Sequence, residues 1–242
     1  MLPLLPLLHA IYEDDDLLVV NKPAGLVCHP TRDGEHSSLV GRVRLHLGHA
    51  EGRLVNRLDR ETSGIVLIAK QAAAAGELGK LLASSQAHKR YWAIVHGHVA
   101  DAGLEIDAPL GRDDAGVVAI KDCVRADGAP ARTSATVERR FTRGGARFTW
   151  LDVTPHTGRK HQIRIHLAHA GHPIVGDKIY GGNERLYLRF IDRTLTPADW
   201  EALMLPNHAL HARRMSFTWR GRVWLFEAPA EPAFVAFLDP AA

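Results

Sequence analysis

One acidic residue, Asp59, lies between two arginines at the entrance to a short apolar run, and this stretch constrains the chain more than any other. Residues 65–69 are all apolar and include isoleucine and valine, which is typical of a buried strand. The three small residues 62–64 before the run favour a tight turn. Because Arg57 and Arg60 favour the charged form of a nearby carboxylate, such a turn can present ionised Asp59 to a cleft. A solvated loop in which Asp59 only caps the turn is the structural alternative.

The composition of the chain permits a nucleic-acid partner without requiring one. The chain has 242 residues, 46% hydrophobic and 24% charged, which suits one large globular domain or two small ones that share a core. Its formal net charge is +3 and its sequence pI is about 9.0. The basic residues occur as separate pairs, each of which could equally be a solvated face, at positions 89–90, 139–140, 159–160 and 213–214.

The cysteines and the N-terminal residues indicate a compartment. Cys28 and Cys123 lie in unrelated sequence contexts, which fits a reducing compartment and gives neither a disulfide framework nor a zinc knuckle. Residues 1–10 are mostly apolar but contain two prolines, lack a leading positive charge and are too short to span a bilayer. We therefore expect a cytoplasmic protein with no membrane partner, in which residues 1–10 lie on a single domain formed by residues 11–235.

Hydrophobic periodicity predicts a strand-rich chain with a few helices. Residues 11–16 are predicted to form a strand that ends in an acidic turn, and residues 17–20 a second strand. Further strands are predicted at residues 65–69, 88–97, 127–137, 147–153, 215–219 and 223–226, with the last two pairs forming hairpins. Helices are predicted at residues 37–47, 71–84, 157–171 and near 197–205. In the third helix, Thr157 is the expected N-cap and Gly171 the expected residue just past the end. Its residues Ile163, Leu167 and Ala170 share one face, which the helix can bury.

Several segments, in order along the chain, resemble the motifs of one enzyme family. Residues 57–64, R-L-D-R-E-T-S-G, match the R-L-D-x-x-T-S-G signature of the RluA-type pseudouridine synthases, which isomerise uridine to pseudouridine within RNA. The other similar segments are N-K-P-A-G at 21–25, K-x-Y-x-A-x-V-x-G at 89–97, T-G-R-x-H-Q-I-R-x-H-L at 157–167, G-H-P-I-x-G-D-x-x-Y-G at 171–181 and H-A-L-H-A at 208–212. Together they cover most of the chain, from about residue 11 to about residue 226.

This resemblance implies a fold and a set of partners. The implied fold is α+β, with a mixed, mostly antiparallel bent β-sheet flanked by helices and an active-site cleft across the sheet. The implied partner is structured RNA, either ribosomal or transfer RNA. Neither a metal nor a nucleotide cofactor is implied, and we expect a monomer without an obligate protein partner.

The resemblance also implies roles for individual residues. Asp59 matches the family's essential aspartate, Tyr91 the tyrosine that lies over the flipped uracil, and Arg164 the arginine that pairs with the aspartate. Without the resemblance, Tyr91 would be interpreted as a core strand residue, although any aromatic side chain can stack on a base. Arg57 matches the arginine that fills the space left by the target base. The basic side chains expected to contact RNA are Arg57, Arg60, Lys89, Arg159, Lys160 and His161.

The reaction implied by the resemblance breaks the C1′–N1 bond of uridine and joins C1′ to C5 of the same base. A carboxylate can act in it as a nucleophile or as a base that abstracts a sugar proton, and the sequence leaves both open. The target base must first leave its stack, at a cost of about a few kcal/mol. Ordinary glycoside hydrolysis uses two carboxylates. Because the resemblance implies a single essential one, Asp59, we interpret Glu61 as structural.

Two features depart from the family pattern. Asn56 stands where family members commonly have a histidine, which preserves hydrogen-bonding capacity but not a titratable ring. This difference puts in doubt a contact with RNA from that position. The sequence also opens directly into the catalytic motifs, so we expect no small S4-like RNA-binding domain.

Two other classes of function compete with this interpretation. Four histidines, at positions 161, 166, 169 and 172, suggest a metal-dependent hydrolase, although the last follows the expected helix end and no acidic or cysteine ligand is near in sequence. A catalytically inactive RNA-binding module is the non-enzymatic alternative. Retention of all three residues that match the catalytic set argues against it.

Overall fold

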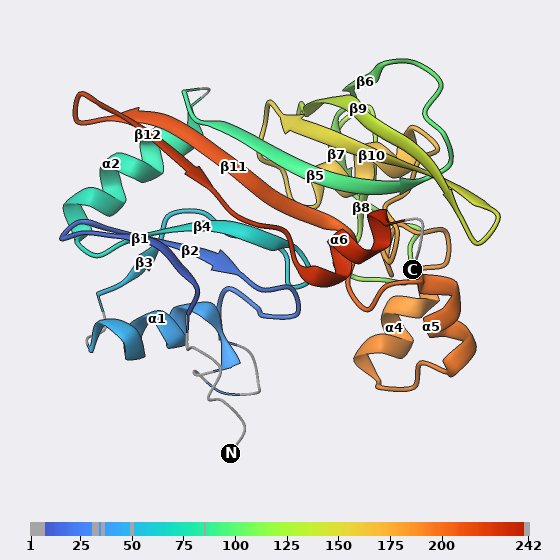
Figure 1. Ribbon diagram of the computed structural model, residues 1–242, viewed down its shortest axis with the longest axis horizontal. Coiled ribbons are helices and arrows are strands. Elements are labelled where there is room, and N and C mark those ends of the chain that lie inside the picture. Colours follow the sequence, from blue (N-terminus) through green and yellow to red (C-terminus); the bar gives the residue numbers. More distant parts are fainter. Residues whose placement is uncertain (1–7, 31–33, 35–36, 49–50, 85, 240–242) are drawn as a thin grey trace. The chain divides into compact units, whose positions relative to one another are not determined.

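Two units, interleaved in sequence, make up this chain. The computed structural model describes residues 8–30, 34, 37–48, 51–84 and 86–239. One unit consists of Met1–Lys89 and His211–Glu231, and the other of Arg90–Leu210 and Pro232–Ala242. Of the apolar segment expected at residues 1–10, residues 1–7 lie outside the described residues. Figure 1 shows the helices and strands of both units, most of them labelled.

A mixed, mostly antiparallel sheet forms the first unit, together with two helices in its described residues. Its elements are β1 (Ala10–Glu13), β2 (Leu17–Lys22), α1 (Leu39–Leu47), β3 (Arg53–Leu54), β4 (Ser63–Ala69), α2 (Ala72–Ala83), β11 (Leu210–Trp219) and β12 (Arg222–Glu227). β2 pairs antiparallel with both β1 and β4, whereas β11 runs parallel to the start of β4. β11 and β12 form the predicted hairpin, with positive φ angles at Arg220 and Gly221 in its turn.

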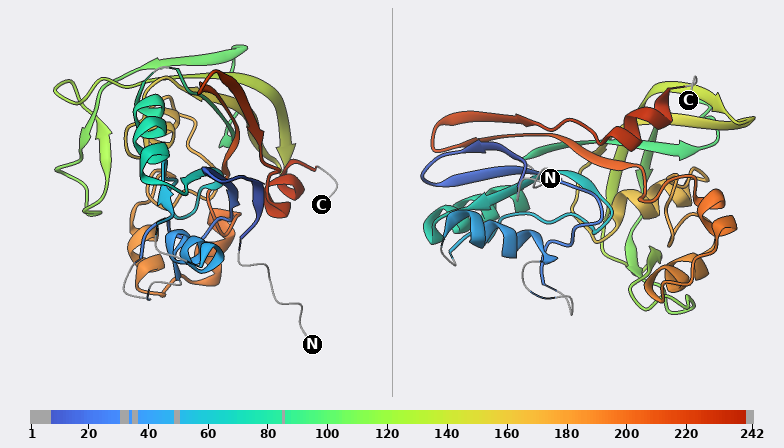
Figure 2. Two further views of the ribbon diagram at one scale, coloured as in Figure 1. Left: turned by 90° about the vertical axis from the view of Figure 1, so that its left-hand side faces the viewer. Right: turned by 60° about the horizontal axis from the view of Figure 1, so that its bottom comes forward.

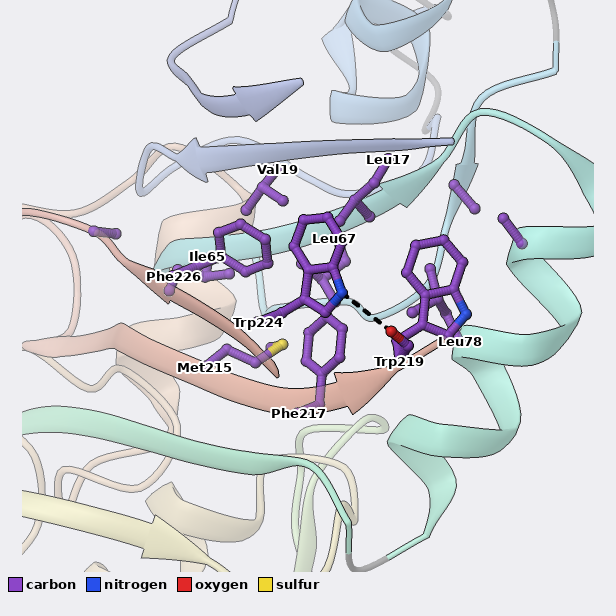
Figure 3. Packing of buried hydrophobic residues seen from close by; sticks show 13 residues of the cluster. Leu17, Val19, Ile65, Leu67, Leu78, Met215, Phe217, Trp219, Trp224 and Phe226 are labelled. Carbon is purple, nitrogen blue, oxygen red and sulfur yellow. Dashed lines mark hydrogen bonds between the residues drawn. The ribbon is translucent and has the colours of Figure 1, made fainter. Parts of the chain in front are cut away.

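The core of the first unit joins β2, β4, α2 and the β11–β12 hairpin (Figure 3). Because successive side chains of a strand point to opposite faces, alternate residues of β2 and β4 enter it. The cluster consists of Leu17, Val19, Ile65, Leu67, Ala69, Ala74, Leu78, Met215, Phe217, Trp219, Trp224, Phe226 and Ala228. Every residue of β4 is buried, as its apolar run predicts. This burial anchors β4, and with it the loop that carries Asp59.

The two helices of the first unit confirm their predictions. α1 begins after Ser38, whose hydroxyl accepts the Gly41 N–H, and it ends at Gly48 in the left-handed conformation. The Ser38 hydroxyl satisfies a backbone N–H that the helix start leaves without a partner, and the left-handed conformation at Gly48 is one that glycine adopts without strain. α2 follows Gln71 and places Leu78 in the core.

Antiparallel strands also dominate the second unit. Its elements are β5 (His88–His96), β6 (Gly103–Asp107), β7 (Leu110–Arg112), β8 (Asp122–Val124), β9 (Arg132–Arg143), β10 (Ala146–Pro155), α3 (Gln162–His169), α4 (Arg185–Ile191), α5 (Pro197–Leu203) and α6 (Pro232–Leu238). β10 pairs with β5 and β9, and β9 pairs with β6. β7 and β8 form a separate hairpin. The α+β class with a mixed, mostly antiparallel sheet is therefore confirmed.

The helix predicted at residues 157–171 is shorter than expected. It begins at Gln162 after His161, which has a φ of 55°, so the prediction of Thr157 as N-cap is wrong. The reason is the side chain of Gln162, whose Oε1 accepts hydrogen bonds from the Thr157 hydroxyl (2.6 Å) and the Arg159 N–H (3.0 Å). These bonds hold residues 157–161 as a turn. Gly171 follows the helix end with a φ of 81°, as predicted.

Other differences concern extent and number of elements. β9 begins at Arg132 instead of residue 127 and continues to Arg143, beyond the predicted end. α3 is buried on every side from Gln162 to Leu167, not only on the predicted face. The sequence predicted α5, which has a capping box at Thr196, but neither α6 nor α4. α4 and α5 lie side by side (Figures 1 and 2), linked by an ion pair between Arg189 and Asp199 at 3.0 Å. No helix within the described part of the chain is long and apolar enough to cross a membrane.

Candidate active site

A turn immediately before β4 carries Asp59. The side chain of Asp59 is half-buried, those of Arg57 and Arg60 are exposed, and Leu58 is buried. The Thr62 N–H donates to the Asp59 carbonyl at 3.2 Å and closes the turn. A turn is thus confirmed beside Asp59, but it spans residues 59–62, because two of the three small residues expected to form it, Ser63 and Gly64, already belong to β4.

The loop after β2 holds the Asp59 turn in place. β2 and β4 are antiparallel, with Lys22 at the end of β2 opposite Gly64 near the start of β4. The loop that follows β2 and the turn that precedes β4 therefore lie at the same end of this strand pair. The Gly25 N–H donates to Arg60 O (2.9 Å), and Arg60 Nε donates to Gly25 O (3.2 Å). Gly25 has a φ of 84°, which glycine adopts without strain. This exchange of bonds fixes the backbone directly after Asp59.

Lys22, the last residue of β2, and Cys28, which follows the loop, also bind the backbone on either side of Asp59. Lys22 is fully buried, and its Nζ donates to the carbonyls of Pro23 (2.8 Å), Leu26 (2.8 Å) and Arg60 (3.1 Å). Burial lowers the pKa of Lys22 to about 8 against the opposing effect of Cys28, Glu231 and Asp59, so Asp59 lies within its electrostatic reach. The Cys28 thiol donates to Leu58 O (3.3 Å) and accepts the Leu58 N–H (3.4 Å).

The T-S-G residues lie against the start of β11. Ser63 Oγ forms a 2.9 Å hydrogen bond with Nδ1 of His211, whose Nε2 donates to Ala228 O at 3.0 Å. Burial lowers the pKa of His211, which favours the neutral ring that these bonds describe. Gly64 has a φ of 112°, and a Cβ there would lie 2.3 Å from Ala212 O. Only glycine allows the two backbones this approach.

Asn56 has a structural role in the first unit. Its Oδ1 accepts the Leu67 N–H at 2.8 Å, and its Nδ2 donates to Ile65 O at 3.2 Å. The amide therefore pairs with the backbone of β4 as a neighbouring strand would. An amide supplies the donor and the acceptor that this position requires, whatever the protonation state of its surroundings.

β5 carries the tyrosine that matches the family's stacking residue. Tyr91 is half-buried and lies opposite Val153 of β10. Lys89 is two residues away and therefore on the same face of the strand, and burial lowers its pKa. Arg90, on the other face, forms a bidentate ion pair with buried Asp152 at 3.0 and 2.9 Å.

Arg164 lies in the first turn of α3 and is paired with Asp177. Its Nε donates to Asp177 Oδ2 at 2.7 Å, and its Nη2 donates to Asp177 Oδ1 at 2.9 Å. Burial alone would raise the pKa of Asp177, but Arg164 outweighs it and holds that pKa well below its usual range. The predicted pairing of Arg164 with Asp59 stays a prediction.

The other predicted RNA contacts of the second unit lie in the turn before α3. Arg159 and Lys160 are exposed, and each has a local partner: Arg159 Nε donates to Pro130 O at 3.2 Å, and Lys160 Nζ to Asp122 at 2.9 Å. His161 is half-buried, with its Nδ1 2.9 Å from the Tyr180 hydroxyl. The turn thus places three basic side chains next to one another.

The histidines that suggested a metal site have separate surroundings. His166 donates from Nε2 to Ala108 O at 2.9 Å and receives the Thr133 hydroxyl at Nδ1 at 2.8 Å. His172 Nδ1 lies 3.0 Å from His96 O. Among the residues that the structure describes, no group of three His, Cys, Asp or Glu side chains could hold a metal ion. The geometry gives the metal-dependent hydrolase no support.

Asp177 and Lys22 are the site residues to which the sequence alone assigned no chemical role. Asp177 lies within residues 174–179, I-V-G-D-K-I, in which every residue other than Asp177 and Lys178 is isoleucine, valine or glycine. An acid in so apolar a segment is rarely fully buried unless it is paired, and this signal could have pointed to a cationic partner.

Comparison with known proteins identifies the class to which this chain belongs. A family described as RNA pseudouridylate synthase matches residues 16–169. The chain belongs to this family, which confirms the resemblance seen in its motifs.

Two curated relatives and one solved structure illustrate the match. The chain is 33% identical over 239 residues to a ribosomal large subunit pseudouridine synthase D of Nitrosomonas europaea, covering 96% of this chain and 64% of the relative. It is 36% identical to the dual-specificity RNA pseudouridine synthase RluA of Vibrio vulnificus, covering 98% and 91%. The structure of human RNA pseudouridylate synthase domain containing 1 superposes with a TM-score of 0.74 at 25% identity, covering 95% and 86%.

Proposed function

We propose that this chain isomerises uridine to pseudouridine in RNA. Family membership supports the reaction class, although the chain spans only 64% of the Nitrosomonas relative. The observation that carries the proposal is the Asp59 turn, in which a half-buried carboxylate lies between two exposed arginines. Hydrogen bonds from the Gly25 N–H and the Lys22 ammonium to the Arg60 carbonyl hold the backbone of this turn. A carboxylate held in this way has a fixed direction and is accessible to a substrate.

The proposed roles follow the family's motifs. Asp59 acts on the sugar or the base of the target uridine, Tyr91 stacks on the flipped uracil, and Arg164 orients the carboxylate. Arg57 enters the space that the flipped base leaves. The RNA backbone is contacted by Arg60, Lys89, Arg159, Lys160 and His161, whose side-chain N–H groups can donate to phosphate oxygens.

Several broader features belong to the same proposal. We propose that residues 11–235 act as one catalytic domain, as a monomer without an obligate protein partner. Both cysteines are free thiols, which supports work in the reducing cytoplasm. The name of the Nitrosomonas relative makes RNA of the large ribosomal subunit the first substrate to test, followed by transfer RNA.

Replacement of Asp59 by asparagine tests the reaction. Asp59→Asn keeps the size of the side chain but removes the charge, so the single-turnover rate of pseudouridine formation should fall by about 10³-fold or more. RNA affinity and thermal stability should stay close to those of the unaltered chain. The rate is measured by mapping pseudouridines in ribosomal and transfer RNA from cells that lack the gene, after incubation with the purified protein.

Glu61→Gln provides a matched control, because it removes a second carboxylate from the same turn. Its rate should stay within about threefold of the unaltered chain. An Asp59→Asn variant with the original rate would disprove the role of Asp59. If the unaltered chain binds RNA but converts no uridine in any cellular RNA, the inactive RNA-binding module is the correct alternative.

A further inference from the structure

The guanidinium of Arg164 is held by one buried carboxylate. Arg164 and Asp177 are 5% and 2% exposed, so both charges are almost fully removed from water. Their two hydrogen bonds, of 2.7 and 2.9 Å, form the parallel fork that arginine and carboxylate prefer. This geometry uses two of the five N–H donors of Arg164 and fixes the plane of its guanidinium.

The carboxylate of Asp177 is itself anchored to the backbone. Its Oδ1 accepts the N–H groups of Ile179 (2.9 Å) and Tyr180 (3.0 Å), and its own carbonyl accepts the Gly181 N–H (3.0 Å). Asp177 is therefore part of a closed turn and does not rotate independently. An arginine fixed by such an acid is fixed relative to the whole turn.

The ring of Tyr180 covers one face of the same guanidinium. The Arg164 Cζ lies 5.0 Å from the ring centroid. The Tyr180 hydroxyl accepts the Asp122 N–H (3.2 Å) and bonds to His161 Nδ1 (2.9 Å), so the ring is also held at its far end. Asp177 thus determines the direction of the guanidinium in its plane, and Tyr180 limits movement out of that plane.

Stability alone is a weak explanation for this arrangement. A buried ion pair loses much of its Coulomb attraction to desolvation, and apolar residues of the same volume often serve the fold as well. What the pair provides that apolar residues cannot is an arginine with a defined direction.

We propose that Asp177 is a positioning residue for pseudouridine formation, whose buried carboxylate fixes the guanidinium of Arg164 in the direction that the reaction requires. The inference rests on the proposed function, because it needs Arg164 to act in catalysis. Asp177 acts through Arg164 and does not itself touch the RNA.

Two substitutions of Asp177 test this role by single-turnover rate, RNA dissociation constant and melting temperature. Asp177→Asn preserves shape but loses the charge, and its rate at saturating RNA should fall by about 10-fold or more, with the dissociation constant within about twofold. Asp177→Glu keeps the charge but lengthens the side chain, so it should also bind RNA normally and react slowly. This second variant decides the question if Asp177→Asn does not fold.

The structure offers a matched control in the same unit. Asp152 is also 2% exposed and also makes a bidentate pair, with Arg90. The side chain of Arg90 is 42% exposed, so only the carboxylate of this pair is buried. Asp152→Asn should lower the melting temperature but leave the rate per folded molecule unchanged. If Asp152→Asn slows the reaction as much as Asp177→Asn, loss of a buried, paired carboxylate explains both results and the proposal is wrong.

Combination with Arg164→Ala separates positioning from an independent effect. If Asp177 acts through Arg164, adding Asp177→Asn to Arg164→Ala should not lower the rate further. A rate reduction that adds fully, or a wild-type rate for Asp177→Asn alone, overturns the inference and leaves the proposed function intact. A chain without activity, or Arg164→Ala at full rate, instead overturns the proposed role of Arg164 and the inference with it.

Discussion

At the scale of single residues, Lys22 shows how a charge can serve position more than stability. Its pKa falls from 10.5 to about 8, so keeping the ammonium charged in this burial costs about 3 kcal/mol near neutral pH. The three hydrogen bonds that the ammonium donates to backbone carbonyls stabilise the fold and offset this desolvation cost. The two contributions are of similar size and opposite sign. Together with the Gly25 N–H, the Lys22 ammonium holds the Arg60 carbonyl, directly after Asp59, in place.

Replacement of Lys22 by methionine should therefore affect the reaction more than the fold. In Lys22→Met, the desolvation cost and the three hydrogen bonds disappear together, so the free energy of unfolding should change by less than about 2 kcal/mol. The rate of pseudouridine formation should fall by about 10-fold or more, because the Asp59 turn loses the hydrogen bond from Lys22 to the Arg60 carbonyl. Urea unfolding and single-turnover kinetics measure the two quantities. A large loss of stability with an unchanged rate per folded molecule would contradict this account.

At the scale of elements, the contact between β4 and β11 depends on one glycine. Ser63 and Gly64 open β4 beside His211 and Ala212, the only register pairs of this parallel contact within the described residues. A Cβ on Gly64 would lie within 2.7 Å of three backbone atoms of Ala212, which cannot move aside as a flexible side chain can. The positive φ of Gly64 adds strain for any other residue.

Gly64→Ala should consequently destabilise the protein by about 3 kcal/mol or more. Gly76→Ala is the control, because Gly76 lies inside α2 without a positive φ, and a Cβ added there would meet no neighbouring segment within 4 Å. That change should stabilise the protein by about 0.5–1 kcal/mol. Urea unfolding of both variants measures the difference, and equal midpoints would show that the approach to Ala212 does not limit residue 64.

At the scale of the whole molecule, buried neutral histidines connect stability to pH. His166 and His211 have no exposed surface, and burial lowers the pKa of each. At His166, Ala108 and Asp107 oppose the lowering of the pKa and His169 adds to it. At His211, the hydrogen bond to Ala228 opposes the lowering of the pKa and Arg213 adds to it. Above about pH 6.5 both rings are neutral whether the chain is folded or unfolded. Below it, the unfolded chain binds protons that the folded chain does not.

The free energy of unfolding should therefore fall as the pH decreases from 7.5 to 5.5. Each of the two histidines should contribute up to about 1.4 kcal/mol per pH unit below its unfolded pKa. The paired carboxylate of Asp177 adds nothing in this range, because its stabilisation is lost only below its unfolded pKa of about 4. Urea unfolding at pH 7.5, 6.5 and 5.5 measures the slope, and a flat or rising stability would refute the assignment.

The sequence alone predicted the strands that carry or follow the site residues, and it identified the family. Period-two alternation and the apolar run predicted β4 and both hairpins, because strand periodicity is a local property of the chain. Likewise, the small residues 62–64 predicted a turn beside Asp59, although the turn lies at residues 59–62 and Ser63 and Gly64 open β4. The ordered motifs identified the family, and their residues Tyr91 and Arg164 were placed on the predicted strand and helix.

Only the tertiary structure decided which side chains support the Asp59 turn and which acid holds Arg164. The bond from Lys22 to Arg60 joins residues 38 positions apart, and that from Ser63 to His211 joins residues 148 apart. The start of α3 also depends on tertiary contacts, because the Gln162 side chain hydrogen-bonds both to Thr157, five residues earlier, and to Thr133 of β9. A local pattern shows where a charge lies along the chain but not what surrounds it. The burial of Lys22 and Asp177 depends on that surrounding, which exists only once distant segments have packed together.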